Sequence, residues 1–304
     1  MPLIKNVVIA GATGLVGRVV SKHMIDSGLF NVTILLRKGS SSSYDTSGSP
    51  SVSVVKVDFA SRQDLEEVLR GQDAVVSALA TTAAEAQIPL IEAASAVGVK
   101  RFLPSEYACK LDSPGTRENP MFASKARVED LLIEKSKASS SLTYTFVLTS
   151  VFLDWGITNR FTIDLTTSTP RVIDGGNLKF STTSLDTLGE AIIGVLNHPE
   201  ETKNRVVQVH DRLTTQNELL DLARKAYPDR RWEPVSVSLD DLVKKAEENL
   251  AQGKLDQETA FSFLYQRIMA PGFGGAFEET DNELLGIQPK GDDFIIQTIK
   301  DFLE

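Results

Sequence analysis

Residues Gly11-Ala12-Thr13-Gly14-Leu15-Val16-Gly17 have the spacing G-x-x-G-x-x-G and lie between an apolar strand and an amphipathic helix. Glycines at this spacing let backbone N–H groups approach a pyrophosphate, and the start of the following helix adds partial positive charge. A tight turn can also require glycine without binding any ligand. At the first strand of the chain, the pattern favours dinucleotide binding and assigns these residues to the cofactor: Gly11, Thr13, Gly14, Leu15, Val16 and Gly17.

The segments around this turn alternate β-branched strands with helix-length amphipathic stretches. Such alternation predicts an α/β fold with a doubly wound parallel sheet, the NAD(P)-binding Rossmann arrangement, in which helices cover both faces. The expected strands span residues 6–10, 31–36, 52–57, 74–78, 101–104 and 144–149. The expected helices span residues 15–27, 62–69, 83–97 and 122–137.

The texture of the chain changes after about residue 151, where strands become shorter and helices, such as 239–251 and 258–269, more charged. We therefore expect a dinucleotide-binding domain at 1–153. A smaller α+β substrate region at 154–304 would pack against it and could share strands with it. The serine-rich stretch 39–50 is interpreted as a mobile loop at the carboxyl edge of the sheet, and the glycine-rich stretch 270–276 as part of the substrate region.

Composition argues against several kinds of partner. The net charge is −9 and no basic patch is present, which disfavours nucleic acid and anionic membranes. The single cysteine, Cys109, excludes an intramolecular disulfide, and the three histidines lack ligand spacing, so no metal is expected. Without an apolar run of about 20 residues or a signal-peptide pattern, we expect a cytoplasmic monomer or homodimer that binds a small-molecule substrate.

Two basic residues at the end of the second expected strand bear on the choice of cofactor. Turns that bind NAD place an acidic residue there, on the ribose 2′-hydroxyl. This sequence has Arg37 and Lys38 instead. A guanidinium beside an ammonium suits the additional 2′-phosphate of NADP(H), although both side chains could simply solvate the start of the loop.

The ends of the next two strands supply further candidates for the cofactor site. Asp58 and Phe59 follow the third strand, and Ser77 and Ala78 end the fourth. The carboxyl ends of neighbouring parallel strands meet at one edge of the sheet, where an adenine and a ribose or nicotinamide would lie. Asp58 could accept from the adenine amine or could cap the helix that starts near Ser61.

Taken together, several segments resemble the isoflavone reductase-like and NmrA-like proteins, an atypical branch of the short-chain dehydrogenases. The segments that carry the resemblance are 11–17, Arg37, 101–107 (Arg-Phe-Leu-Pro-Ser-Glu-Tyr) and 122–128. Residues 149–156 and 281–286 look like fungal members of the group. The resemblance spans most of the chain, and 101–107 is its most specific segment.

The resemblance implies NADPH binding and, as in the plant reductases, a lysine after the Pro-Ser-Glu loop that assists hydride transfer. That lysine is Lys125 here. Ordinary short-chain dehydrogenases use Tyr-x-x-x-Lys, whereas this chain has Met121 at the tyrosine position. An ammonium can still hold the ribose, polarise an acceptor or donate a proton. The alternative is a surface salt bridge between Lys125 and Glu129, which have i,i+4 spacing.

Residues after the fifth and sixth strands complete the candidate site. Glu106 and Tyr107 follow the fifth strand and could serve as a proton relay, a substrate contact or a loop scaffold. Ser150 and Phe152 are assigned to the cofactor. The substrate pocket is assigned to Phe152, Asp154 and Trp155, although large apolar side chains at a strand end are often core.

The sequence leads to one favoured function and two alternatives. The favoured one is an NADPH-dependent reductase that delivers hydride to an electrophilic carbon of a small, apolar or aromatic, secondary-metabolite-like substrate, assisted by Lys125. A redox-silent NADP sensor that regulates a protein partner is the first alternative. A cyclase or isomerase that uses acid catalysis without redox chemistry is the second. The sequence does not identify the substrate.

Overall fold

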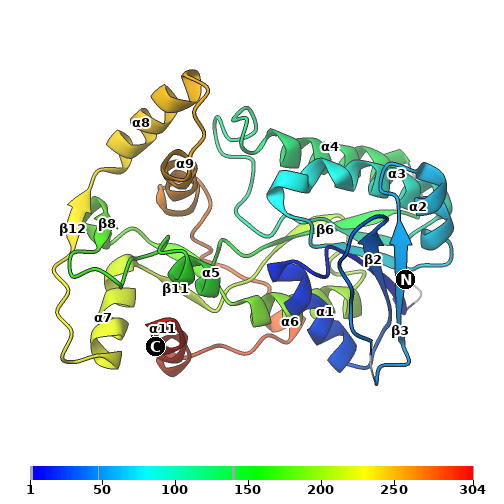
Figure 1. The fold of residues 1–304 in the computed structure, drawn as a ribbon, viewed down its shortest axis with the longest axis horizontal. Coiled ribbons are helices and arrows are strands. Elements are labelled where there is room, and N and C mark those ends of the chain that lie inside the picture. Colours follow the sequence, from blue (N-terminus) through cyan, green and yellow to red (C-terminus); the bar gives the residue numbers. More distant parts are fainter. Residues whose placement is uncertain (1–2, 47, 139–140, 304) are drawn as a thin grey trace.

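The computed structural model describes residues 3–46, 48–138 and 141–303. Its centre is a seven-stranded sheet in which every pairing is parallel (Figure 1). The strand order is β10-β6-β5-β4-β1-β2-β3, which reverses direction at β1 and β4 as in a doubly wound fold. The strands are β1 (Asn6–Ala10), β2 (Asn31–Arg37), β3 (Val52–Val57), β4 (Ala74–Ser77), β5 (Arg101–Leu103), β6 (Thr143–Leu148) and β10 (Arg205–Gln208).

Helices cover both faces of this sheet because alternate side chains of each strand point to opposite sides. Val7 and Ile9 of β1 belong to one apolar cluster, and Val8 and Ala10 belong to another. The first cluster packs under α1 (Leu15–Asp26), α6 (Leu185–Asn197) and the short α10 (Asn282–Leu285). The second packs under α2 (Arg62–Leu69), α3 (Gln87–Val97) and α4 (Ala123–Ala138).

The second part of the chain forms a smaller region with its own apolar cluster. Two small sheets lie there, one with the order β11-β9-β7 and one that pairs β12 with β8. Their strands are β7 (Val151–Phe152), β8 (Arg171–Ile173), β9 (Phe180–Thr183), β11 (Arg212–Thr214) and β12 (Val235–Val237). The helices are α5 (Leu153–Thr158), α7 (Gln216–Ala226), α8 (Leu239–Ala251), α9 (Gln257–Met269) and α11 (Asp292–Leu303), with a short 3₁₀ turn η2 (Asp174–Gly176).

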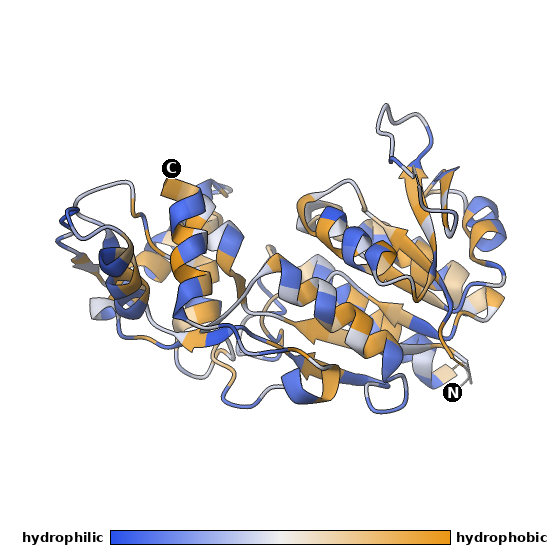
Figure 2. Ribbon diagram, turned by 90° about the horizontal axis from the view of Figure 1, so that it is seen from below, coloured by the Kyte–Doolittle hydropathy of each residue, from blue (hydrophilic) through white to orange (hydrophobic). Residues whose placement is uncertain are grey.

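The amphipathic pattern of the helices is visible from below, where orange and blue residues alternate along them and orange predominates in the strands between them (Figure 2). Figure 1 shows that α8 and α9 stand on the same side of the molecule as α4, with the sheet strands between them and α6.

The region after Leu153 also contributes to the central sheet, since β10 pairs with β6 at its edge.

One expected helix is wrong at its start. The segment 83–97 was expected to be continuous, but a 3₁₀ helix η1 (Thr81–Ala86) comes first and α3 begins at Gln87. Pro89 explains the break, because its ring would clash with the carbonyl of Glu85 in a continuous α-helix. The other expected strands and helices are found with boundaries that differ by one or two residues.

Arg101 of β5 connects the segment before the edge strand β10 to the central sheet. Its guanidinium is fully buried and donates to the hydroxyls of Thr143, Thr145 and Thr202 at 2.8–2.9 Å, and to the carbonyl of Pro199. Burial lowers the pKa of Arg101 to about 10, so the side chain remains charged near neutral pH. The residue therefore ties β5 and β6 to the segment that leads into β10.

We expect Arg101→Met to lower the free energy of unfolding by about 3 kcal/mol, because it leaves buried hydroxyls and a carbonyl without their donor. The measurement is urea unfolding at neutral pH. Arg62→Met is the matched control, since Arg62 is exposed and forms an ion pair with Glu66 one turn away. The control should change stability by no more than about 0.5 kcal/mol. Equal losses in the two variants would show that Arg101 is no anchor.

Candidate functional site

The glycine turn is shaped by two close approaches of the backbone. Gly11 has a φ of +90°, and a Cβ there would lie 2.6 Å from the carbonyl oxygen of Ala78 at the end of β4. A Cβ on Gly17 would lie 2.0 Å from the carbonyl oxygen of Gly11. Side chains at these two positions would force the turn, α1 and β4 apart, so glycine is a steric requirement at both.

The middle glycine of the turn, Gly14, faces outward. Gly14 is exposed and precedes α1 as its N-cap, without any side-chain hydrogen bond to the first turn. The first turn of α1 carries no acidic residue. The N–H groups at the start of this 12-residue helix are therefore free to meet a negatively charged group that approaches over Gly14. This geometry fits the diphosphate of a dinucleotide.

Arg37 and Lys38 lie at the carboxyl edge of β2, as expected, and both are exposed. The ammonium of Lys38 forms an ion pair with Asp64 in the first turn of α2. Arg37 is therefore the better placed of the two to meet a phosphate. Lys38 would have to leave Asp64 to do the same.

Asp58 does not cap the following helix, so one of its two expected roles is wrong. Ser61 is the cap of α2, and its hydroxyl accepts from the N–H of Asp64 at 3.2 Å. Asp58 instead accepts from the N–H of Ala60 at 2.9 Å in the turn before the helix, and its side chain is exposed at the sheet edge. Phe59 packs partly against the apolar cluster beneath α2 and α3.

A cavity of about 230 Å³ joins the glycine turn to the loop after β5. The structure thus brings together residues from five separate segments of the sequence. Thr81 and Ser105 were not predicted to line the site, although they follow β4 and β5 at the same carboxyl edge. The lining residues are Gly14, Leu15, Val16, Ala78, Leu79, Ala80, Thr81, Ser105, Tyr107, Lys125 and Phe152.

Lys125 lies in the first turn of α4 and is 7% exposed. Its ammonium donates to the carbonyl of Ser105 at 2.6 Å and lies 3.4 Å from Oε2 of Glu106. Glu129 is paired with Arg117 at 2.8 Å instead. The alternative interpretation of Lys125 as half of a surface salt bridge with Glu129 is therefore wrong, and its charge is turned toward the cavity loop.

Two hydrogen bonds donated by Ser105 fix the loop that contacts Lys125. The N–H of Ser105 donates to the fully buried side chain of Gln87 at 2.9 Å, and its hydroxyl donates to the carbonyl of Leu79 at 2.8 Å. Glu106 is 1% exposed, and its Oε1 has no hydrogen-bond partner among the described residues. Burial raises the pKa of Glu106, and the charge of the nearby Lys125 opposes this rise.

Tyr107 is one of the residues that line the cavity. Its hydroxyl donates to the carbonyl of Ser77 at 2.8 Å. Burial raises the pKa of Tyr107 far above its ordinary value, which makes the phenol a weak acid. Of the three roles considered for Tyr107, this arrangement favours the scaffold over the proton relay.

A second, more apolar cavity of about 290 Å³ adjoins the first and shares Leu15, Val16, Thr81, Tyr107 and Phe152 with it. Its remaining walls come from the loop after β5, from β7 and the residue before it, from α5 and from α9. The residues that it does not share are Ala108, Cys109, Ser150, Val151, Trp155, Leu264, Arg267 and Ile268. Burial raises the pKa of the Cys109 thiol, which disfavours the thiolate form that a cysteine nucleophile requires.

Asp154 does not line either cavity, which corrects its assignment to the substrate pocket. Its carboxylate accepts from the N–H of Leu185 at 2.8 Å, at the start of α6. The reason is that α5 begins at Leu153, and neighbouring side chains on a helix diverge by about 100°. Trp155 consequently faces the apolar cavity while Asp154 faces α6.

The described residues provide neither a metal site nor a membrane-spanning helix. Across residues 3–46, 48–138 and 141–303, no group of three or more His, Cys, Asp or Glu side chains could hold a metal ion. In the same part of the chain, no helix is long and apolar enough to span a bilayer.

A model of the NmrA-like family matches residues 4–255. The chain belongs to the NmrA-like family. The oxidoreductase poxI of Penicillium oxalicum is 30% identical over 284 residues, which cover 89% of this chain and 86% of poxI. The oxidoreductase aprR of Aspergillus flavus is 29% identical over 97% of this chain and 98% of its own length.

Solved structures share the fold of this NmrA-like chain. The leucoanthocyanidin reductase of Vitis vinifera, solved as a binary complex with NADPH, superimposes with a TM-score of 0.78 at 23% identity. The match covers 97% of this chain and 99% of the reductase. The doubly wound sheet and the smaller region after it are therefore arranged as in that protein.

We expect Glu129, beside Lys125 on α4, to make stability fall as the pH rises. Burial and, secondly, the charge of Glu106 raise the pKa of Glu129 to about 7 from an ordinary 4.5. The folded protein therefore binds more protons than the unfolded chain between these values, and the free energy of unfolding decreases with pH in that window. Glu129→Gln should reduce this decrease by on the order of 2 kcal/mol.

The measurement is urea unfolding at a series of pH values from about 4.5 to 7.5. Glu134→Gln is the control, because Glu134 lies on the same helix with a side chain that is 71% exposed. The control should retain the slope of the natural protein. Parallel curves for the natural protein and Glu129→Gln would contradict the expectation.

Proposed function

We propose that this NmrA-like protein is an NADPH-dependent reductase that delivers hydride to an electrophilic carbon of a small apolar or aromatic molecule, with assistance from Lys125. The observation that carries the proposal is the meeting of the glycine turn and Lys125 in one cavity that shares a wall with a second, apolar one. The names of the relatives poxI and aprR, both oxidoreductases, support the reaction class. The NADPH complex of the Vitis vinifera reductase supports the cofactor.

The bound dinucleotide would run along the carboxyl edge of the sheet. Its diphosphate fits over Gly14 at the start of α1, and Arg37 at the end of β2 is placed to bind the 2′-phosphate. The exposed Asp58 and the neighbouring Phe59 flank the adenine end. The nicotinamide end belongs in the cavity with Lys125, and the cofactor supplies the hydride there.

Lys125 supplies a fixed positive charge at this end. Its ammonium is already held by the carbonyl of Ser105, so it need not be ordered when the ligands bind. From that position it can hold the ribose or polarise an acceptor atom of the substrate. Glu106 is its ion-pair partner and acts as a positioning residue, because no atom of Glu106 lines either cavity.

The substrate would occupy the adjoining apolar cavity. Phe152 lines both cavities, and Trp155, Leu264 and Ile268 extend the apolar wall away from Lys125. Such walls favour an aromatic or otherwise apolar molecule with its electrophilic carbon at the Lys125 end.

The two alternative functions use the site less completely. A redox-silent NADP sensor needs the glycine turn, but it has no use for a buried ammonium in the cavity beside that turn. Acid catalysis without redox chemistry needs a proton donor at the cavity. The hydroxyl of Tyr107, one of the groups considered for that role, donates to a backbone carbonyl, and burial raises its pKa.

Arg37→Ala should weaken binding of NADPH by tenfold or more and leave binding of NADH nearly unchanged, because only NADPH has the phosphate that the guanidinium would contact. A charge-assisted hydrogen bond contributes about 1.5–3 kcal/mol. Fluorescence or calorimetric titration measures both affinities. Arg70→Ala is the control, since Arg70 is exposed at the end of α2, on the opposite edge of the sheet. If Arg37→Ala keeps the preference for NADPH, the assignment of Arg37 is wrong.

Lys125→Met should retain NADPH binding within a few-fold and lower the rate of NADPH oxidation by about a hundredfold or more, as expected for loss of a positioned acid or electrostatic group. The measurement is the loss of NADPH absorbance with a panel of aromatic conjugated ketones and imines. Lys137→Met, at the exposed end of the same helix, is the control. Turnover that survives in Lys125→Met would remove the residue from the reaction. Product formation without NADPH oxidation would favour the non-redox alternative.

A further inference from the structure

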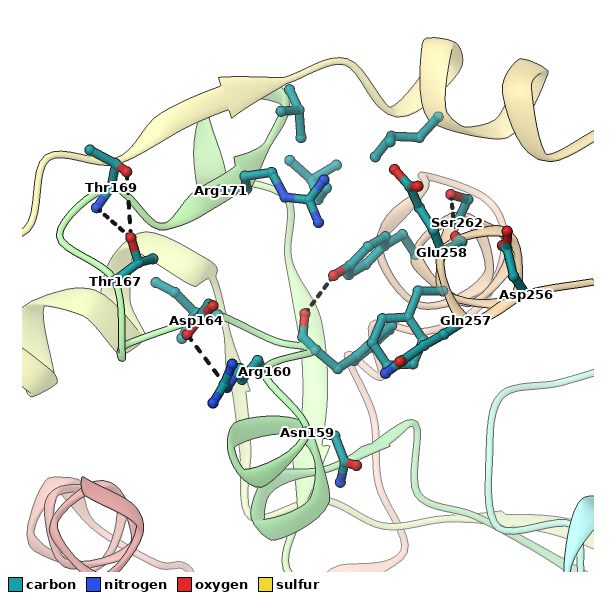
Figure 3. A pocket seen from close by; sticks show the side chains of 17 residues that line it. Asn159, Arg160, Asp164, Thr167, Thr169, Arg171, Asp256, Gln257, Glu258 and Ser262 are labelled. Carbon is teal, nitrogen blue, oxygen red and sulfur yellow. Dashed lines mark hydrogen bonds and ion pairs between the residues drawn. The ribbon is translucent and has the colours of Figure 1, made fainter. Parts of the chain in front are cut away.

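A separate cavity of about 740 Å³ lies in the second region, between α9 and the small sheet of β8 and β12 (Figure 3). It is larger than either cavity of the candidate site, and it shares no lining residue with them. Its volume is within the range of small-molecule sites, which is about 300–1,000 Å³. The reductase proposal gives this cavity no role.

One wall of the cavity consists of aromatic rings. Tyr265 is stacked on Phe161 with ring centroids 4.5 Å apart and an angle of 9° between the planes. Phe261 meets Phe161 edge to face at 5.0 Å. Phe161 is buried behind the other two, which are half-buried and line the cavity. The hydroxyl of Tyr265 donates to the carbonyl of Phe161 at 2.9 Å, which fixes its ring. The wall is therefore a rigid surface suited to a planar apolar group.

The carboxylates around the cavity already have partners. Asp164 lies 3.9 Å from the guanidinium of Arg160 and accepts from the N–H of Thr166. Asp256 caps α9, where it accepts from the N–H of Thr259 at 2.9 Å. Glu258 lies 3.6 Å from the ammonium of Lys245.

Arg171 is the exception among the charged residues that line the cavity. Neither a hydrogen bond nor an ion pair of its guanidinium is found in the described part of the chain. Figure 3 shows its side chain extending from β8 over the cavity. The charge of Arg171 also opposes the rise in the pKa of Tyr265, which is consistent with a short separation. The cavity thus has an aromatic wall and, as far as the described residues go, one cation without a partner, the exposed Arg171.

We propose that this cavity binds a small aromatic carboxylate, with its ring against Phe261 and Tyr265 and its carboxylate on Arg171. A guanidinium binds a carboxylate through two parallel hydrogen bonds, and the aromatic wall supplies contact area for the ring. The proposed site is independent of the reductase proposal, because it requires neither NADPH nor Lys125.

Isothermal titration calorimetry of the whole protein with 4-hydroxycinnamate, benzoate and indole-3-acetate tests the proposal. We expect saturable binding of at least one of these acids, at one site per chain. Arg171→Met should weaken the binding by about tenfold or more, the loss expected for a charge-assisted pair. The neutral methyl ester of the same acid should bind the natural protein and Arg171→Met equally.

Two control variants locate the site. Arg160→Met removes the other guanidinium of the cavity, which is paired with Asp164, and should weaken binding much less than Arg171→Met. Lys125→Met removes the cation of the candidate active site and should leave binding unchanged. An unchanged midpoint of urea unfolding shows that Arg171→Met is folded.

The proposal is overturned if none of the three acids binds saturably up to its solubility limit. It is also overturned if Arg171→Met binds the acid as tightly as the natural protein does. Loss of binding in Lys125→Met alone would place the acid in the candidate active site instead. A chain that binds the acid at Arg171 but never binds NADPH would retain this inference and contradict the reductase proposal.

Discussion

The carbonyl oxygen of Gly11 leaves no space for a side chain at position 17, where a Cβ would lie only 2.0 Å away. This contact fixes the angle at which α1 leaves β1. Because Gly11 is also pressed against the carbonyl of Ala78, the same turn fixes the end of β4. The free N–H groups of α1 are consequently aimed at the carboxyl edge of the sheet, where the loops after β4 and β5 converge. Every other feature of the candidate site is positioned relative to this turn.

The loop after β5 and the helix α4 place several buried charges next to one another. Lys125 is paired with Glu106, and Glu129 is paired with Arg117. Arg267 of α9 is 3% exposed, and its guanidinium donates to the carbonyls of Cys109 and Lys110 at 2.7 Å. Burying so many charged groups reduces stability unless every group is well paired. Glu106 and Arg267 each keep one buried polar atom without a partner among the described residues. A cluster of this kind, beside two cavities, is typical of a functional site.

The sequence predicted those parts of the fold that depend on local chemistry. Glycine spacing located the turn, and β-branched runs located the strands, because both patterns act over a few residues. The break before α3 was missed because the apolar pattern continues across it. The break arises because the ring of Pro89 prevents one continuous α-helix from including Glu85. The sequence offered only Glu129 as an ion-pair partner of Lys125, because the i,i+4 spacing is a local pattern. Glu106 was missed as that partner because only the tertiary position of the loop after β5 brings it to 3.4 Å from the ammonium. The cavity at Arg171 joins segments about 100 residues apart, which no local pattern connects.

The junction between the two regions carries backbone strain at Ser150, whose φ of +55° is unusual for a residue with a side chain. The N–H groups of Thr149 and Ser150 both donate to the carbonyl of Ala108, at 3.2 and 3.1 Å, which holds the chain in this conformation. Strain of this kind persists only where the surrounding structure over-determines it, and it is concentrated at functional sites. Here it turns the chain from β6 into β7, so that Phe152 enters the wall shared by the two cavities. A relaxed extended conformation at Ser150 would carry Phe152 elsewhere and separate the Lys125 cavity from its apolar neighbour.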